Sequence, residues 1–228
     1  MSEHRYHQYC ALAKALDAVG NRWTLLIIRE LGPGPRRFTD LVDALPGISR
    51  KLLTERLRDL ERDSIITRRE LPPPAARQVY ELTQDGCELA TAMAPLIAWG
   101  ARLLGDRQPE EFISPRGTAV AMVGLADRDA AKGVSETYQY FVGTQAFYFV
   151  VDDGSIELHD GRAEDPAVVV TTDKDTWADI AAGKTKASSA TAAGALSVVG
   201  DRPAVKRLGK VFSRRHMLGD AEPAKGAA

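Results

Sequence analysis

Apolar positions recur at helical spacing between residues 36 and 62, where the chain reads RRFTDLVDALPGISRKLLTERLRDLER. The spacing predicts two short helices, with Thr39 as the N-cap of the first helix and Asp40 in its first turn. Pro46-Gly47 separates the two helices, because proline cannot continue a helix and glycine tolerates a turn. The other segments are interpreted around this helix pair.

The second helix of the pair is strongly amphipathic. Ser49 is its expected N-cap, and Leu53, Leu57 and Leu60 share one face, which must pack against a core. The opposite face carries the polar and charged residues Lys51, Thr54, Glu55, Arg58 and Arg62. Such a helix, preceded by a helix and a turn, is typical of a helix-turn-helix that reads the major groove of DNA. The alternative is an ordinary surface helix, which also directs charges outward.

A basic hairpin is expected after this helix. Residues 65–71 are predicted to form a strand, residues 72–76 a loop and residues 77–82 a returning strand. Two helices followed by a hairpin are the order of a winged helix. Arg68, Arg69 and Arg77 would then place positive charge near DNA phosphates or in a minor groove.

Helices are also predicted on both sides of this core. Residues 10–19 and 23–31 form the first two, and residues 85–104 form a longer helix that Pro95 bends or interrupts. The residues expected to face inward are Leu12, Ala15, Leu16, Val19, Trp23, Leu26, Ile27 and Leu31. The long helix is more apolar than one small domain needs. It therefore either builds a dimer interface or docks on a second domain.

The pattern changes after a polar stretch at residues 105–111, the expected linker. We therefore predict one domain over residues 1–107 and another over residues 108–228. The second domain is predicted to contain a short helix at residues 117–129 and strands at residues 137–142, 146–151, 156–159, 167–171 and 196–199. Three more helices are expected at residues 177–182, 188–193 and 203–212, and the tail after Arg214 is expected to be disordered. The fold class is α+β with a mostly antiparallel sheet.

Charge and composition exclude several classes of protein. The net charge is −1, but residues 1–107 carry +2 and residues 108–228 carry −3, so DNA binding would depend on a local basic face. Two cysteines do not make a disulfide framework, and no apolar run is long enough for a membrane span. The N-terminus lacks the apolar core of a signal peptide, so we expect a cytoplasmic protein without membrane partners. The scattered histidines and the missing catalytic motifs predict no metal, no cofactor and no enzymatic activity.

The N-terminal motifs resemble one family of bacterial regulators. Cys10, NRWTLLIIREL at residues 21–31, RRFTDLVDALPGIS at 36–49, KLLTERLRDLE at 51–61, VYELTQDG at 79–86 and Trp99-Gly100 follow the pattern of HxlR-type winged-helix regulators. The resemblance implies a homodimeric transcriptional regulator of double-stranded DNA, with the N-terminal helix and the 85–104 helix at the dimer interface. The residues expected to face DNA are Arg37, Ser49, Arg50, Lys51, Thr54, Arg58, Arg68 and Arg77. One departure is Asp63-Ser64, where the family usually has glycine after the recognition helix.

The C-terminal pattern is similar to the sterol-carrier-protein-like domain, over roughly residues 115–213 and on weaker motifs. The resemblance implies an apolar tunnel for a small apolar or lipid-like effector. The residues expected to line it are Tyr138, Tyr140, Phe147, Phe149 and Trp177, together with Val168, Val170 and Ile180. The same side chains would equally make a filled core, because a sheet covered by helices needs them.

Cys10 lies where the resembled family commonly carries a cysteine that some members use to sense electrophiles or oxidants. A thiol at a helix N-terminus ionises more easily, because the exposed N–H groups favour the thiolate. The alternative is a small buried hydrophobe under the dimer helices. Cys87 is expected to be structural.

Three functions follow from these features. The first is a dimeric DNA-binding regulator that acts as a repressor and whose C-terminal domain senses an apolar ligand. The second is a regulator governed by thiol chemistry at Cys10. The third is a lipid carrier with an attached helical module, which is the least supported because no catalytic constellation accompanies it.

Overall fold

The computed structural model describes residues 5–71, 77–108 and 110–213. The chain divides into two compact units, Met1–Ala90 and Thr91–Ala228. The expected domain boundary after residue 107 stays a prediction. The expected loop at residues 72–76 and the expected disordered tail lie outside the described residues.

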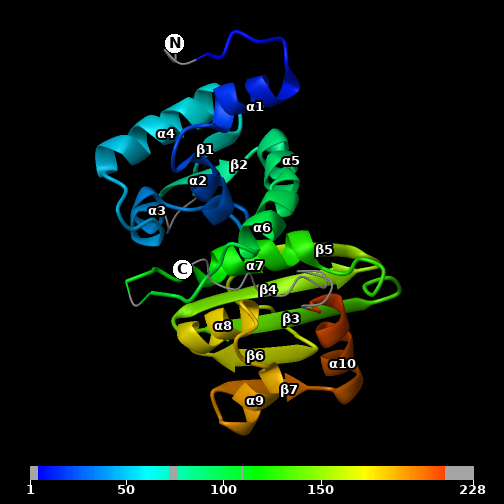
Figure 1. Ribbon diagram of the computed structural model, residues 1–228. Helices are drawn as coiled ribbons and strands as arrows, with labels where there is room; N and C mark the ends of the chain where they lie inside the picture. Colours follow the sequence, from blue (N-terminus) through cyan, green and yellow to red (C-terminus); the bar gives the residue numbers. More distant parts are fainter. Residues whose placement is uncertain (1–4, 72–76, 109, 214–228) are drawn as a thin grey trace. The chain divides into compact units, whose positions relative to one another are not determined.

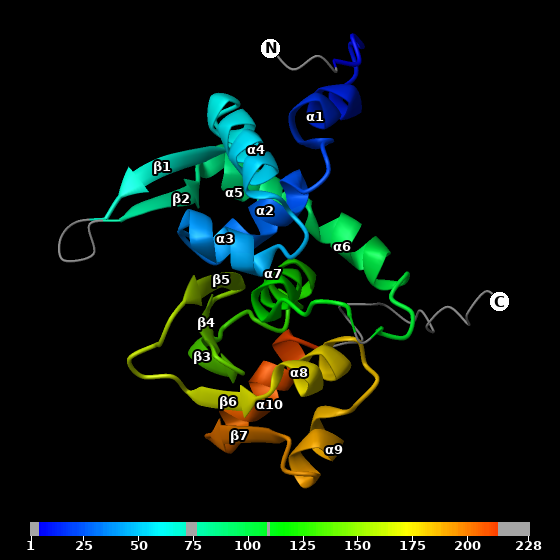
Figure 2. The same ribbon diagram turned by 90° about the vertical axis from the view of Figure 1, so that its left-hand side faces the viewer.

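The N-terminal unit is built from helices and one hairpin (Figures 1 and 2). Its elements are α1 (Ala11–Val19), α2 (Thr24–Leu31), α3 (Phe38–Ala44), α4 (Arg50–Arg62), β1 (Ile66–Glu70), β2 (Gln78–Leu82) and α5 (Gln84–Ala92), whose last residues belong to the second unit. The two strands pair antiparallel, with Arg68 opposite Tyr80. Arg36 adds a bridge to Tyr80 on the other edge of β2. This is the predicted winged helix-turn-helix.

The apolar stripes predicted for α2 and α4 form the core of this unit. Ile27, Ile28, Leu31 and Leu41 are buried, and they share the core with Leu53, Leu57 and Leu60. Burial of a Leu or Ile side chain contributes about 1.5–3 kcal/mol, so these positions hold the helix pair and the hairpin together.

Two details of this unit differ from the sequence expectations. α3 begins earlier than expected, with Arg37 rather than Thr39 as N-cap, because the Asp40 carboxylate accepts a hydrogen bond from the Arg37 backbone N–H at 3.0 Å. On α1 only Ala13 and Val19 are buried, whereas Leu12, Ala15 and Leu16 are exposed in the single chain.

Trp23 and Leu26 also differ from the expected core. Trp23 is half-buried at the N-cap of α2 with a left-handed φ of 81°, and Leu26 is 39% exposed.

The second unit is a five-stranded sheet with helices. It contains α6 (Ala94–Ala101), α7 (Pro115–Leu125), β3 (Ser135–Val142), β4 (Gln145–Asp152), β5 (Ser155–Asp160), β6 (Val168–Thr172), α8 (Lys174–Ala181), α9 (Ala187–Ala192), β7 (Leu196–Gly200) and α10 (Arg202–Val211). The strand order is β5-β4-β3-β6-β7, and only the β3–β6 pair is parallel. Figure 2 shows α7, α8 and α10 on one face of this sheet. The predicted α+β fold class with a mostly antiparallel sheet is confirmed.

Local sequence signals explain the turns of this unit. Asp153 and Gly154 both have positive φ, as the two central residues of a tight hairpin turn require. The helix predicted to start at Asp173 or Asp175 is capped by Asp173, whose carboxylate accepts from the backbone N–H groups of Asp175 and Thr176. The 85–104 helix is interrupted at Met93, just before Pro95, and becomes α5 and α6.

The segment between β5 and β6 crosses the sheet beside Gln139. This side chain is buried, and its Nε2 donates to the carbonyls of Tyr140, Phe147 and Gly161. Its Oε1 accepts from the Ala163 backbone N–H at 2.7 Å. Gln139 thus joins backbone groups of the Gly161–Ala163 segment to strands β3 and β4.

Candidate functional site

The exposed face of α4 is the candidate DNA-reading surface. Ser49 caps the helix, since its Oγ accepts from the Leu52 N–H at 3.2 Å. The buried leucines of α4 are at most 1% exposed and fix the rotation of the helix, so Lys51, Thr54 and Arg58 face solvent. The predicted cap and both predicted faces are therefore present.

The cations of this surface fall into two groups. Arg50, Lys51 and Arg58 are exposed, and no ion pair is recorded for them within the described ranges. The Arg50 guanidinium lies 6.0 Å from the Phe38 ring centroid. Because no carboxylate offsets their charge, these three side chains can offer it to phosphates or base edges.

Other predicted cations already have carboxylate partners. Arg37 Nε lies 3.0 Å from Asp40, and Arg68 lies 3.1 Å from Glu61 and 5.3 Å from the Tyr80 ring centroid. Exposed pairs of this kind are worth about 0–1 kcal/mol, so a phosphate can compete for either arginine. Arg77 is exposed and directly precedes strand β2.

Two other predicted residues have internal roles. The Thr54 hydroxyl donates to the Arg50 carbonyl at 2.9 Å, and the Ser49 hydroxyl oxygen is the helix cap. Their remaining hydrogen-bonding capacity is what a phosphate or base could use.

The end of α4 is set by residues whose role the sequence shows only weakly. Ser64 has a left-handed φ of 57°, which confirms that this chain places serine where glycine is the usual residue. The Ser64 N–H donates to the Glu61 carbonyl and the Ile65 N–H to the Leu60 carbonyl, which is a Schellman C-cap. The cap is retained without glycine.

α5 packs closely against this cap. A Cβ at Gly86 would lie 2.2 Å from the Ile65 carbonyl oxygen. Thr83 caps α5, because its Oγ1 accepts from the Gly86 N–H at 3.1 Å while it donates to the Ser64 carbonyl. Threonine is a common N-cap residue, but the link of Thr83 to the α4 cap is a tertiary feature.

Both cysteines are exposed. Cys10 is the N-cap of α1, and its carbonyl accepts from the Lys14 N–H at 2.9 Å. Cys87 lies on α5. Because both thiols are exposed in the single chain, burial does not distinguish a reactive thiol from a structural one.

The five predicted ligand-lining residues meet in the core of the second unit. Tyr138, Tyr140, Phe147, Phe149 and Trp177 are each at most 5% exposed. The Tyr140 ring centroid lies 5.7 Å from Phe147 and 5.3 Å from Trp177, so these rings pack against one another. An apolar cavity between them requires the rings to move apart. Its existence stays a prediction.

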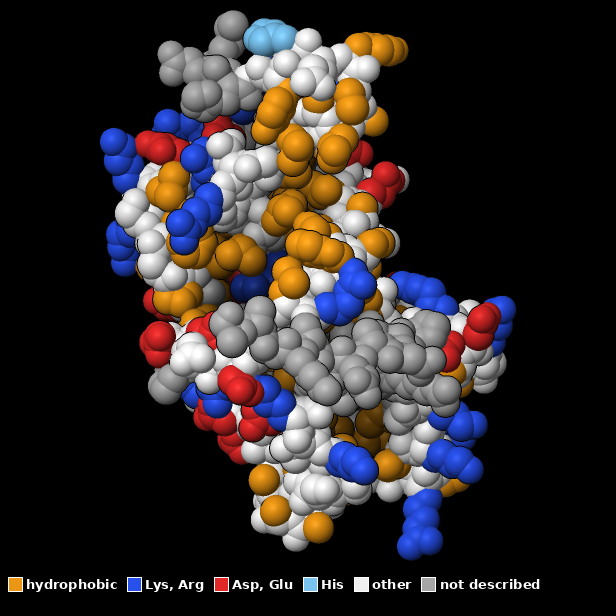
Figure 3. All heavy atoms as spheres, viewed as in Figure 1, with side chains coloured by type: hydrophobic (Ala, Val, Ile, Leu, Met, Phe, Trp, Pro, Cys, Tyr) orange, Lys and Arg blue, Asp and Glu red, His pale blue; other side chains and the backbone are white. Residues whose placement is uncertain are grey.

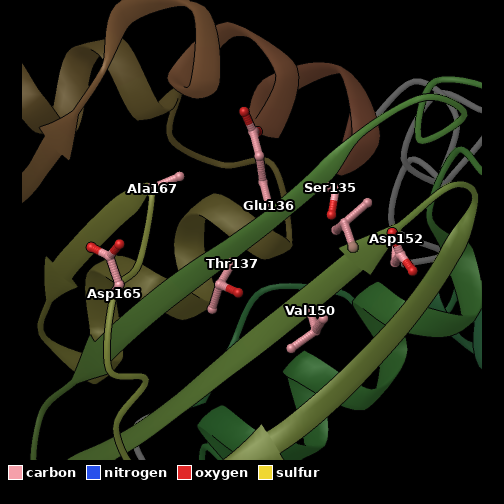
Figure 4. Close-up of a pocket in the computed structure, with 8 residues that line it drawn as sticks. Ser135, Glu136, Thr137, Val150, Asp152, Asp165 and Ala167 are labelled. Atoms are coloured by element: carbon pink, nitrogen blue, oxygen red, sulfur yellow. The ribbon is translucent and has the colours of Figure 1, made fainter.

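A separate polar pocket of about 430 Å³ lies over β3 and β4 (Figure 4). Its lining residues are Ser135, Glu136, Thr137, Val150, Val151, Asp152, Asp165 and Ala167. Figure 4 shows Glu136 directed toward α10, where the Arg207 guanidinium pairs with it. Hydrogen bonds from Arg207 and Tyr138 lower the pKa of Glu136, and burial together with Glu136 raises the pKa of Tyr138.

The described residues contain no group of three or more His, Cys, Asp or Glu side chains that could hold a metal ion. In the same part of the chain, no helix is long and apolar enough to cross a membrane.

Comparisons with known proteins match both parts of the chain. The family described as HxlR-like helix-turn-helix matches residues 18–108, and the SCP-2 sterol transfer family matches residues 123–213. The first match contains the α4 surface, and the second contains the aromatic core of the sheet.

Individual relatives match the N-terminal part. The HTH-type transcriptional regulator YodB of Bacillus subtilis is 36% identical over 102 residues, covering 44% of this chain and 91% of that protein. The uncharacterized HTH-type transcriptional regulator sll1512 of Synechocystis is 40% identical over 101 residues, covering 44% and 75%. The solved reduced form of B. subtilis YodB has 35% identity and a TM-score of 0.39, covering 43% of this chain and 100% of that one. Because 91% of the B. subtilis regulator is matched at 36% identity, this chain belongs to the HxlR-like helix-turn-helix family of transcriptional regulators, and it carries an SCP-2 sterol transfer family domain after that module.

Proposed function

We propose that this regulator is a homodimeric repressor that binds double-stranded DNA through α4 and the β1–β2 hairpin. The observation that carries the proposal is the exposed cationic face of α4, where Arg50, Lys51 and Arg58 have no ion pair in the described structure. The face is held outward by the buried leucines on the other side. Binding, without a catalytic step, accounts for the activity we propose, and it would take place in the cytoplasm, where bacterial DNA lies.

Within this proposal the eight predicted residues have different tasks. Arg50, Lys51 and Thr54 lie on the first turns of α4 and would reach base edges, while Arg58 and Arg77 would neutralise phosphates. Arg37 and Arg68 would leave their partners Asp40 and Glu61 and pair with phosphates instead. Ser49 contributes mainly by capping α4.

The dimer is supported by apolar side chains at the surface. Leu12 on α1 is 67% exposed, and Trp99 on α6 is 54% exposed. Leu16, Leu96, Leu103 and Leu104 are exposed as well, and Figure 3 shows hydrophobic side chains at the surface over α1 and over α6. Surface of this kind is favourable to bury against a second copy. A symmetric dimer would also place two recognition helices about 34–36 Å apart, as one face of DNA requires.

The C-terminal domain is proposed to sense a small apolar or lipid-like effector. The support is the SCP-2 sterol transfer family match over residues 123–213 and the aromatic core within it. To control DNA binding, the effector must favour one dimer geometry, since a ligand with equal affinity for both shifts nothing.

A second candidate function rests on Cys10. Its thiol is exposed at the N-cap position of α1, where a reagent can reach it. Modification there would alter the same helix that is proposed to form the dimer. The test is the rate of alkylation of Cys10 against Cys87 in the native protein, with DNA release followed in parallel. A Cys10 that reacts no faster than Cys87, or reacts without DNA release, removes this candidate.

The decisive experiment for the first proposal has two steps. Genomic fragments bound by the purified protein are selected and sequenced, and the strongest fragment is placed before a reporter gene. We expect a two-fold symmetric site, and we expect the protein to lower reporter expression. If fragments are retained without sequence preference, or the reporter rises, specific repression is wrong. Organic extraction of the purified protein, followed by a search for bound lipid in the extract, then shows whether the C-terminal domain binds a ligand or has a purely structural role.

A further inference from the structure

Four buried polar atoms of the C-terminal unit have no hydrogen-bond partner among the described residues. They are Nε and Nη1 of Arg116, Oε1 of Gln145 and Nε1 of Trp177. Burial of a polar group without a hydrogen bond is unfavourable, and native cores contain few such groups. Three side chains of one domain that share this property need a common explanation.

Each of the three residues is linked to Phe147 by a ring contact, a cross-strand pair or strand alternation. The Trp177 and Phe147 ring centroids are 5.8 Å apart. Arg116 pairs with Asp160, the cross-strand neighbour of Phe147 in the β4–β5 pair. Gln145 precedes Phe147 by two positions on β4, so both side chains lie on the same face of the sheet. Register and ring contacts therefore relate all three residues to Phe147 on the helix-covered face.

Arg116 dominates the electrostatics of this place. It is 7% exposed at the start of α7, and its Nη2 contacts the carboxylate of Asp160. The Asp160 side chain is 39% exposed, so the pair opens toward solvent on the aspartate side. The first turn of α7 adds a helix N-terminus, which also favours negative charge. A planar guanidinium with unused N–H groups is the side chain best suited to a carboxylate.

We propose that Arg116, Trp177 and Gln145 form a subsite for the carboxylate of an organic acid with a compact apolar body. The proposal rests on the ligand-binding function proposed above and specifies the polar end of its ligand. Arg116 and Trp177 supply donors, and the Gln145 amide can turn to present its NH2 group. Phe147 and the Trp177 ring supply the apolar surroundings of the body.

Other ligand chemistries fit these residues less well. A cation would meet the Arg116 guanidinium, and a pure hydrocarbon would leave all four atoms without partners. A phosphate dianion would exceed the single positive charge of Arg116, part of which Asp160 already offsets. A monovalent carboxylate adds the least negative charge of the anionic groups, and its two oxygens match the planar donors of Arg116.

The test compares two probes with the same apolar body on the full-length protein. Calorimetric titration with 4-butylbenzoate and with 4-butylbenzyl alcohol is carried out on the native chain, Arg116→Met and Trp177→Phe. We expect the benzoate to bind at least about tenfold more tightly than the alcohol, the ratio that one charge-assisted contact supplies. Arg116→Met should remove this preference and leave alcohol binding unchanged. Arg128→Met is the matched control, because Arg128 is an exposed arginine of the same unit whose guanidinium donates to the Gly154 carbonyl.

Trp177→Phe removes the indole N–H together with part of the buried ring, and it keeps the test valid if Arg116→Met does not fold. Its preference for the benzoate over the alcohol should fall several-fold. This ratio reports the lost donor, because the smaller ring affects the apolar body of both probes alike. In the native protein, the Trp177 indole N–H resonance should shift with the benzoate and not with the alcohol.

Equal binding of both probes, or benzoate binding indifferent to Arg116 and Trp177, overturns the carboxylate subsite and leaves an apolar ligand in place. If neither probe binds, the subsite is overturned together with the proposed ligand-binding function.

Discussion

The hydroxyl of Thr83 donates to the carbonyl oxygen of Ser64 at 2.7 Å, and so links the first turn of α5 to the residue that ends α4. Ser64 is left-handed, and the α5 backbone approaches the neighbouring Ile65 carbonyl at Gly86. The exit of the recognition helix and the start of the following helix therefore form one tightly packed junction. Two substitutions test it in opposite directions.

Ser64→Gly should stabilise the N-terminal domain. Glycine adopts positive φ without the steric cost that serine has, which should raise the free energy of unfolding by about 0.5–1 kcal/mol. The more flexible unfolded chain of the glycine variant reduces this gain by a small amount. Urea denaturation followed by circular dichroism measures it. Ser197→Gly, in the middle of strand β7, is the control and should destabilise. A loss of stability in Ser64→Gly would contradict the C-cap description.

Gly86→Ala should destabilise, although alanine in a helix is normally favoured over glycine by about 1 kcal/mol. The new Cβ would lie 2.2 Å from the Ile65 carbonyl oxygen, so α5 must move away from the α4 cap. We expect a loss of about 1–3 kcal/mol, as for other overpacked sites. Gly209→Ala on α10 is the control, because no atom lies within 4 Å of its added Cβ. It should be neutral or stabilising.

The double variant Lys51→Ala/Arg58→Ala should weaken operator binding and its salt dependence. If both side chains contact phosphates, the slope of log K against log salt should fall by about 2. Fluorescence anisotropy at several salt concentrations measures both quantities. Arg62→Ala serves as the control, since Arg62 already pairs with Asp59 and Asp63. Unchanged affinity and slope in the double variant would remove α4 from the DNA interface.

Leu12→Glu/Trp99→Glu should yield a monomer at micromolar concentration. A charge at an apolar interface loses burial and adds a desolvation penalty, so we expect the dimer dissociation constant to rise more than about tenfold, or 1.4 kcal/mol. Sedimentation velocity measures the mass. Val199→Glu is the control, because Val199 is equally exposed on β7 but belongs to neither proposed dimer helix. A native protein that is already monomeric contradicts the dimer outright.

The Glu136–Arg207 pair should make the C-terminal domain more sensitive to acid. Hydrogen bonds from Arg207 lower the pKa of Glu136 in the folded state, so the carboxylate binds its proton less readily there than in the unfolded chain. The pair therefore stabilises the fold above the ordinary glutamate pKa, and this stabilisation is lost as pH falls below roughly 4.

The variant Glu136→Gln tests this dependence. Its stability deficit against the native protein should be present at pH 7 and should shrink as the pH is lowered through that range. Glu157→Gln, at an exposed position on β5, should show a smaller dependence. A deficit in Glu136→Gln that is the same at pH 7 and pH 3 would show that the contribution is not electrostatic.

Local patterns in the sequence were sufficient for the elements of both domains. The apolar spacing of Leu53, Leu57 and Leu60, the Ser49 cap and the Asp153-Gly154 turn each depend on interactions within a few residues, so they can be read without a fold. For the same reason the interruption near Pro95 could be predicted. Cap positions are harder to predict from the sequence. The Asp40 carboxylate accepts from the Arg37 N–H, so α3 begins after Arg37 and not after Thr39.

The tertiary structure decided which side chains are available for function. Periodicity places Leu12 and Leu16 on an apolar face, but only the packed chain shows that both are exposed in the described part of the single subunit. Composition lists Arg37, Arg50, Arg58 and Arg68 as equal cations, whereas the folded chain gives partners to two of them. Arg116 was invisible in the sequence, because its significance comes from burial beside Asp160, 44 residues away. Such facts arise from contacts between distant segments, and a linear pattern does not contain them.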